Sequence, residues 1–153
     1  MNVLVPFDGS DPAKKALELA IERFGDENIV LLNVVPPNIA VGPSLNYPAS
    51  SIDEMKPAGG LDTFVREGLE AEEAASYELL EDAKATAAAH GVDVEIDVWF
   101  GRVSDAIIEF AEAHDIDHII MGSHGRTGPT RILLGSVAQK VAERSPTPVT
   151  IAR

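Results

Sequence analysis

The fold is decided by residues 121–136, which read MGSHGRTGPTRILLGS. An apolar run over residues 119–121 predicts a buried strand, and three glycines and one proline follow it within eight residues. Gly135-Ser136 then opens an amphipathic run, residues 137–144, which predicts a helix. Such a loop lets backbone N–H groups approach an anion, and the first helical turn adds unpaired N–H groups and the positive end of its dipole. A parallel sheet also needs glycines at its turns, so this loop alone leaves a phosphate site and a purely structural turn open.

Strand and helix patterns alternate along the rest of the chain. Continuous apolar runs predict buried strands, and apolar residues at three- and four-residue intervals predict helices. The N-terminal helix is expected to begin with Asp11 as its N-cap and Pro12 at its first position, and to end at Gly25. Strands are expected at residues 3–5, 29–35, 92–98, 117–121 and 149–152, and helices at 12–24, 62–90, 103–114 and 137–144.

This alternation predicts an α/β fold in which helices cover both faces of an open, parallel, five-stranded sheet. Residues 92–98 alternate strictly between apolar and acidic side chains, which indicates a strand with one wet face at the edge of the sheet. The order 3-2-1-4-5 places that third strand at the edge. We expect one domain over residues 1–153, with a long variable loop at about 38–60 that serves as a lid, as a binding loop or as a disordered segment.

Charge is distributed unevenly along the chain. The formal net charge is −13, yet residues 122–153 carry only one acidic side chain against five basic ones. The segment with the glycine loop is thus the one that attracts anions. The basic residues late in the last helix also complement its dipole, but that explanation does not cover Arg126 and Arg131.

Composition excludes several classes of protein. A strongly acidic chain argues against nucleic acid as a partner, because phosphate backbones need a basic face. No run of eighteen apolar residues and no basic-then-apolar leader is present, so we expect neither a membrane span nor a secretory signal and place the protein in the cytoplasm. The chain has no cysteine, which removes disulfide and thiolate chemistry. Acid excess with only five lysines suggests a salt-adapted source.

The spacing Gly122-x2-Gly125-x9-Gly135-Ser136 resembles the nucleotide-binding signature of the universal stress protein family, in its ATP-binding branch. The resemblance also covers the opening residues 3–10, the end of the second strand and the closing residues 146–151, and it is weakest over 38–60. It implies the five-stranded fold described above, which is like that of the adenine nucleotide alpha hydrolases. It also implies bound ATP, AMP or ADP, with Mg²⁺ held by the phosphates, and a homodimer that pairs the strand Val149–Ala152 across a two-fold axis.

The predicted site lies where two loops meet. In the order 3-2-1-4-5 the chain reverses direction between strands 1 and 4, and ligands of open α/β sheets bind beyond the carboxyl ends of the strands at such a point. Residues 7–10 follow strand 1, and the glycine loop follows strand 4. We expect the backbone at Met121, Gly122, Gly125, Ser136 and Val137 to hold phosphates, with the Ser136 hydroxyl as a further donor and Gly135 allowing close approach.

Other site residues carry alternative interpretations. Arg126 either clamps phosphate oxygens or is a solvated loop charge. By resemblance, Asp8 lies near the ribose or a phosphate-bound Mg²⁺, and Pro6 and the Val34 backbone border adenine; otherwise Asp8 simply shapes a turn. His124 has no serine or carboxylate partner at a telling spacing. We therefore assign no catalytic residue and no side-chain metal site.

Rival nucleotide motifs do not fit. The first loop lacks the three glycines of a dinucleotide-binding turn, and no Walker sequence is present. Two functional classes stay open: a regulatory protein that binds ATP with slow or no hydrolysis, and an ATP-dependent hydrolase or transferase whose acceptor binds at residues 38–60. The lack of a recognisable general base favours the first. A third option is an interaction module that binds no nucleotide, against which the intact glycine spacing argues.

Overall fold

The structure is a computed structural model that describes residues 1–36, 46–49, 63–124 and 134–153. Within these residues strands and helices alternate as the apolar patterns predict. The elements are β1 Asn2–Pro6, α1 Asp11–Phe24, β2 Asn28–Val35, β3 Tyr47–Pro48, α2 Thr63–Ala89, β4 Val94–Phe100, α3 Val103–Ala113, β5 His118–Gly122, α4 Ser136–Arg144 and β6 Val149–Ala152.

The strands form one sheet in the order β3-β4-β2-β1-β5-β6. Every pairing between β4, β2, β1, β5 and β6 is parallel, whereas β3 pairs with β4 in the antiparallel sense. Counted over the parallel strands alone, the order is 3-2-1-4-5, so the predicted fold is confirmed. The reversal of chain direction lies between β1 and β5, because β1 pairs with β2 on one side and with β5 on the other.

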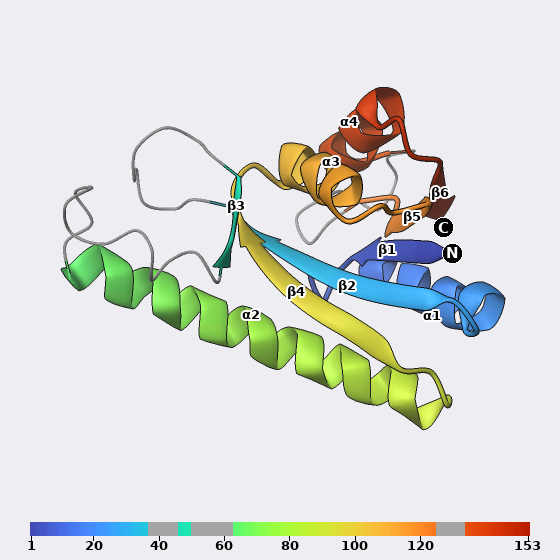
Figure 1. Ribbon diagram of the computed structural model, residues 1–153, viewed down its shortest axis with the longest axis horizontal. Helices are drawn as coiled ribbons and strands as arrows, with labels where there is room; N and C mark the ends of the chain where they lie inside the picture. Colours follow the sequence, from blue (N-terminus) through green and yellow to red (C-terminus); the bar gives the residue numbers. More distant parts are fainter. Residues whose placement is uncertain (37–45, 50–62, 125–133) are drawn as a thin grey trace.

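Helices cover both faces of the sheet, as Figure 1 shows: α1 and α2 lie on one face, and α3 and α4 lie on the other. Each face has its own apolar cluster, since alternate residues of a strand point to opposite sides. Val3 and Val5 of β1 face α1 and α2, whereas Leu4 faces α3 and α4. These three side chains are completely buried. Burial on both faces explains why β1 and β2 read as continuous apolar runs.

The strand β4 lies at the edge of the parallel sheet, as its alternation predicts, but β3 borders part of it. Tyr47 lies opposite Phe100, and Pro48 lies opposite Trp99. The side chain of Asn46 also accepts a hydrogen bond of 2.9 Å from the backbone N–H of Arg102. Residues 46–49 belong to the loop predicted at 38–60, so this part of the loop pairs with the sheet. The remainder of that loop lies outside the described residues.

The start of α1 corrects a prediction. Ser10, rather than Asp11, is the N-cap: its backbone is extended, and its hydroxyl accepts a hydrogen bond of 3.2 Å from the N–H of Ala13. Asp11 and Pro12 are therefore the first two residues of the helix, where an acidic side chain and a proline are both favourable. Ser10 and Asp11 are adjacent and both residue types are good N-caps, so the sequence alone does not decide which of them caps the helix.

The long helix α2 has 27 residues and packs on β4 and β2. Its buried side includes Leu69, Ser76, Leu80, Ala83 and Ala87. Among the helices of the described chain, none combines the length and the apolar character needed to cross a membrane.

Candidate functional site

A cleft of about 390 Å³ opens at the point where the chain reverses direction across the sheet. Its walls come from the carboxyl ends of β1, β2 and β5, the loop between β1 and α1, and the starts of α3 and α4. The volume is within the usual range for small-molecule sites. This is the place where open α/β sheets bind ligands.

The structure brings together the predicted site residues that it describes. The cleft lining contains Pro6, Asp8, Val34, Met121, Gly122, Gly135, Ser136 and Val137. These residues belong to β1, β2, β5 and α4 and to the loop positions next to them, and only the parallel topology places them side by side. Two further predictions, Gly125 and Arg126, lie outside the described residues.

The N-terminus of α4 provides hydrogen-bond donors at one end of the cleft. Gly135 is the N-cap and has no side chain to cap the helix, in contrast to Ser10 at the start of α1. The backbone N–H groups of the first turn lack partners within a helix, so those of Ser136 and Val137 remain available for a ligand. Both residues line the cleft, and Ser136 is exposed. An anion placed here would meet these donors and the positive end of the helix dipole.

Contacts within the protein itself favour glycine at the two described glycine positions of the motif, Gly122 and Gly135. A Cβ atom on Gly122 would lie 2.6 Å from atoms of Pro12, so this glycine lets α1 pack closely against β5. A Cβ atom on Gly135 would lie 3.0 Å from the Cα atom of His124. The N–H of Gly135 also donates to the carbonyl of Ser123 at 2.6 Å and is therefore not available to a phosphate. We predicted that these glycines make room for a ligand; the structure shows that both also make room for the protein's own backbone.

Asp8 is tied to its own loop. One carboxylate oxygen accepts a hydrogen bond of 2.9 Å from the backbone N–H of Ser10, which is the turn-forming role considered as an alternative. The side chain is half-buried and still lines the cleft. The turn uses one oxygen, so a second acceptor remains for a ligand hydroxyl.

The sequence did not predict one polar residue of the lining, Asn33, or a hydrogen-bonded pair that places Ser123 beside the lining residue His124. Asn33 donates a hydrogen bond of 2.8 Å from its side-chain amide to the backbone carbonyl of Phe7 and so joins the ends of β2 and β1. The Ser123 hydroxyl lies 3.0 Å from Nδ1 of His124, a pair that the adjacent positions of the two residues could have suggested. The statement that His124 lacks a serine partner is therefore wrong. A single asparagine within an apolar strand was the available signal for Asn33.

Electrostatics in the described part of the cleft depend on the backbone. Its lining includes Asp8 and His124 but no lysine or arginine among the described residues. The described side chains with shifted pKa values lie elsewhere; burial raises the pKa of Asp97 on β4, and the Val98 N–H partly offsets that rise. The attraction for an anion that is visible here comes from the α4 terminus.

Comparison with known proteins places this geometry in a family. The model of the universal stress protein family matches residues 1–153. The universal stress protein MJ0531 of Methanocaldococcus jannaschii is 33% identical over 99% of this chain and 81% of its own. The structure of the universal stress protein UspA from Lactobacillus plantarum superposes with a TM-score of 0.77 at 25% identity, over 100% of this chain and 97% of the other.

One solved structure of similar fold contains a nucleotide. It is a universal stress protein in complex with cAMP, with a TM-score of 0.64 and 25% identity, covering 99% of this chain and 94% of the other. The family match over the whole chain, the identity to a curated member and the structural similarity to UspA agree with one another. The chain belongs to the universal stress protein family.

Proposed function

We propose that this protein binds an adenine nucleotide, ATP or its mono- or diphosphate, in the cleft between β1 and β5. The observation that carries the proposal is the open N-terminus of α4, which has no side-chain cap and lies in the wall of a cleft at the point of chain reversal. The cAMP complex of a universal stress protein with the same fold supports the choice of nucleotide.

In this proposal the phosphates bind at α4. The N–H groups of Ser136 and Val137 donate to phosphate oxygens, and the Ser136 hydroxyl adds a donor. Mg²⁺ would be held by the phosphates themselves. The proposal also assigns phosphate contacts to the backbone at Met121, Gly122 and Gly125 and to Arg126, and gives Gly135 the role of keeping the α4 terminus close to the end of β5.

The base and the sugar occupy the rest of the cleft. Apolar walls from Pro6, Val34, Val103, Ile107 and Met121 suit the faces of an adenine ring. Val34 and Met121 are buried, so a ring between them would be largely removed from water. The second carboxylate oxygen of Asp8 is free of the turn and would accept a ribose hydroxyl.

We further propose that the nucleotide acts as a regulatory signal, with slow or no hydrolysis. Among the described residues of the cleft, Asp8 and His124 are the side chains that could act as a general base. In this proposal Asp8 accepts from the Ser10 N–H and from the ribose hydroxyl, and Nδ1 of His124 lies 3.0 Å from the Ser123 hydroxyl. An ATP-dependent transferase or hydrolase is the competing function. Turnover of ATP well beyond one equivalent in the presence of Mg²⁺ would favour that alternative.

The test uses a charge placed where the phosphates should lie. Ser136→Asp introduces a carboxylate at the first position of α4, where an acidic side chain favours the helix, so the fold should be retained. Isothermal titration should show ATP affinity lowered by about tenfold or more. Ala142→Glu adds the same charge to an exposed position of the same helix and should bind ATP like the wild type. Equal affinity in all three proteins would contradict the proposal.

The homodimer through β6 also enters as a proposal. β6 pairs with β5 on one side, and no further strand of the described chain borders its other side. Val149, Thr150 and Ile151 are only half-buried. An edge strand with unpaired backbone groups can pair with a second copy across a two-fold axis.

A further inference from the structure

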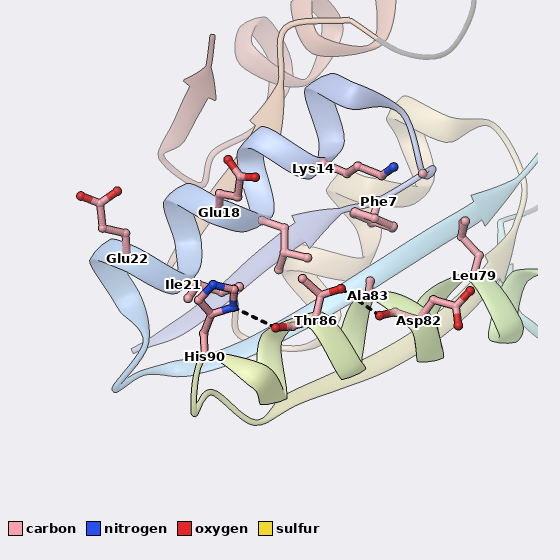
Figure 2. A pocket seen from close by; sticks show the side chains of 12 residues that line it. Phe7, Lys14, Glu18, Ile21, Glu22, Leu79, Asp82, Ala83, Thr86 and His90 are labelled. Atoms are coloured by element: carbon pink, nitrogen blue, oxygen red, sulfur yellow. Dashed lines mark hydrogen bonds between the residues drawn. The ribbon is translucent and has the colours of Figure 1, made fainter.

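A second, larger cavity of about 720 Å³ lies on the opposite face of the sheet from α3 and α4, in the groove between α1 and α2. On the other face α3 and α4 pack directly against each other. Figure 2 shows that the side chains of the groove come from both helices and that Phe7 lies between them. We propose that this groove is a binding site for a small amphipathic cation, an apolar body that carries an ammonium group.

The floor of the groove is apolar. Phe7, Leu17 and Ala83 belong to the buried core, and Ile21 and Leu79 are only partly buried. The partly buried pair leaves apolar surface accessible from the groove. A ligand with an aromatic or alkyl body would remove that surface from water, which favours binding by roughly 25 cal/mol per Å² of apolar area.

The rim of the groove is acidic on both sides. Glu18 and Glu22 of α1 lie one turn apart, and Asp82 of α2 belongs to the opposite wall (Figure 2). Among the described residues the lining contains these three carboxylates and a single ammonium group, that of Lys14. None of the four forms a salt bridge within the described part of the chain. The rim therefore offers unpaired negative charge above an apolar floor.

The charges are also arranged along the groove. Lys14 lies at the Phe7 end, whereas Glu22 and His90 lie at the other end, as Figure 2 shows. Nδ1 of His90 is 2.9 Å from the carbonyl oxygen of Thr86. A carbonyl only accepts, so Nδ1 must donate, and Nε2 of the neutral ring is left as an acceptor. An ammonium group at this end would donate to this acceptor and be attracted by the exposed Glu22 carboxylate at the rim, with its apolar body extending toward Phe7.

Dimensions favour a small molecule over a protein partner. The row from Lys14 to Glu22 covers two helical turns, or roughly 12 Å. A volume of about 720 Å³ is within the range of small-molecule sites. A stable protein interface needs about 1,000 Å² or more of buried surface, well beyond a groove of two helical turns. The ligand class that fits is thus an organic amine, recognised by charge at one end and by apolar contact along its body.

The test titrates phenylbutylamine into protein labelled with nitrogen-15 and follows the backbone amide signals. Saturable shift changes should appear in α1 around Leu17–Glu22 and in α2 around Leu79–His90. Phenylbutyrate, of similar size but opposite charge, should leave these signals unchanged. Changes confined to the cleft between β1 and β5, or equal changes with phenylbutyrate, would overturn the inference. Groove signals that move with protein concentration alone, together with a higher molecular mass, would assign the groove to a second copy and also overturn it.

Three variants distinguish specific binding in the groove from general attraction of a cation to an acidic protein. Glu18→Gln with Glu22→Gln should lower the amine affinity by about fivefold. Glu109→Gln with Glu112→Gln removes two exposed carboxylates from α3 on the other face and should change it less than twofold. Thr86→Trp, at an exposed position of the wall, should fill the groove and abolish binding. Equal losses in the two double variants, or undiminished binding by Thr86→Trp, would contradict the site. ATP binding is not needed for any of these outcomes.

Discussion

The side-chain amide of Asn33 donates a hydrogen bond of 2.8 Å to the carbonyl oxygen of Phe7. Asn33 belongs to β2, and Phe7 begins the loop between β1 and α1. The same loop receives a backbone bond, because the Phe7 N–H donates to the carbonyl of Leu32 at 2.8 Å. Phe7 lines both the cleft and the groove between α1 and α2. This pair of bonds therefore fixes the wall that separates the two cavities.

Asn33→Ala should lower both the stability of the protein and its affinity for ATP. Loss of the side-chain bond should lower the free energy of unfolding by about 1 kcal/mol and reduce ATP affinity several-fold, because the Phe7–Ser10 loop loses one of its supports. Asn28→Ala is the matched control, since Asn28 lies on the same strand and bonds the Asn2 side chain at the far end. Denaturant unfolding and calorimetric titration measure the two effects. Equal ATP affinity in both variants would contradict this role.

Ser10→Ala tests the corrected start of α1. The hydroxyl of Ser10 accepts from the Ala13 N–H, so its removal should cost about 1 kcal/mol of unfolding free energy. Asp11→Ala should cost less, because Asp11 is the first residue inside the helix and caps nothing. The urea concentrations at half-unfolding compare the two variants, provided that the unfolding free energy falls with urea at the same slope in both. A larger loss in Asp11→Ala would restore the assignment made from the sequence.

The elements of the fold could be predicted because each long segment carries one clear period. The apolar run of Ile29–Val35 and the alternation before Trp99 each leave one choice of secondary structure, and a parallel order then follows from strands alternating with helices. β3 could not be predicted in this way. It is two residues long, includes Pro48, and depends on Asn46 reaching the Arg102 backbone rather than on a local pattern.

Most of the described site was predictable because both loops follow buried strands that topology places together. The sequence could not show which contacts require each residue type at its position. Gly122 has Pro12 against it, a contact between segments more than a hundred residues apart. Gly122→Val would therefore push α1 away from β5, whatever its effect on a ligand. The groove between α1 and α2 depends on helix spacing, which amphipathic patterns do not specify.

Asp97→Asn should make stability less sensitive to pH. Burial raises the pKa of Asp97 in the folded protein above its ordinary value of 3.8. The folded state then holds its proton more tightly than the unfolded state, so stability falls as pH rises through this window and stays lower at neutral pH. The amide cannot ionise but can still accept from the Val98 N–H.

Thermal unfolding should therefore show a higher Tm for Asp97→Asn than for the wild type near neutral pH. The difference should shrink below the ordinary carboxyl pKa. Glu95→Gln, at an exposed position of the same strand, serves as the control. A variant less stable than the wild type near neutrality would contradict the assigned cost of burial.

The proposed dimer is best tested at Ile151. The N–H of Ile119 donates to the Pro148 carbonyl at 2.9 Å, and Ile119 lies opposite Val149. In a parallel ladder of this phase, the backbone groups of Thr150 point toward β5 and those of Ile151 point away. Thr150→Pro would therefore remove a hydrogen bond between β6 and β5 within the sheet itself. Ile151→Pro should give a monomer in light scattering with its circular dichroism retained; a folded variant that keeps twice the monomer mass would contradict pairing through β6.

The location of the nucleotide can be measured directly by titrating ATP and Mg²⁺ into nitrogen-15-labelled protein and mapping the backbone amide shifts. We predict saturable changes that are largest at Ser136 and Val137, with smaller changes at Asp8 and Val34, and none along the groove face of α2. No saturable change, or changes that avoid the start of α4, would contradict nucleotide binding at this cleft.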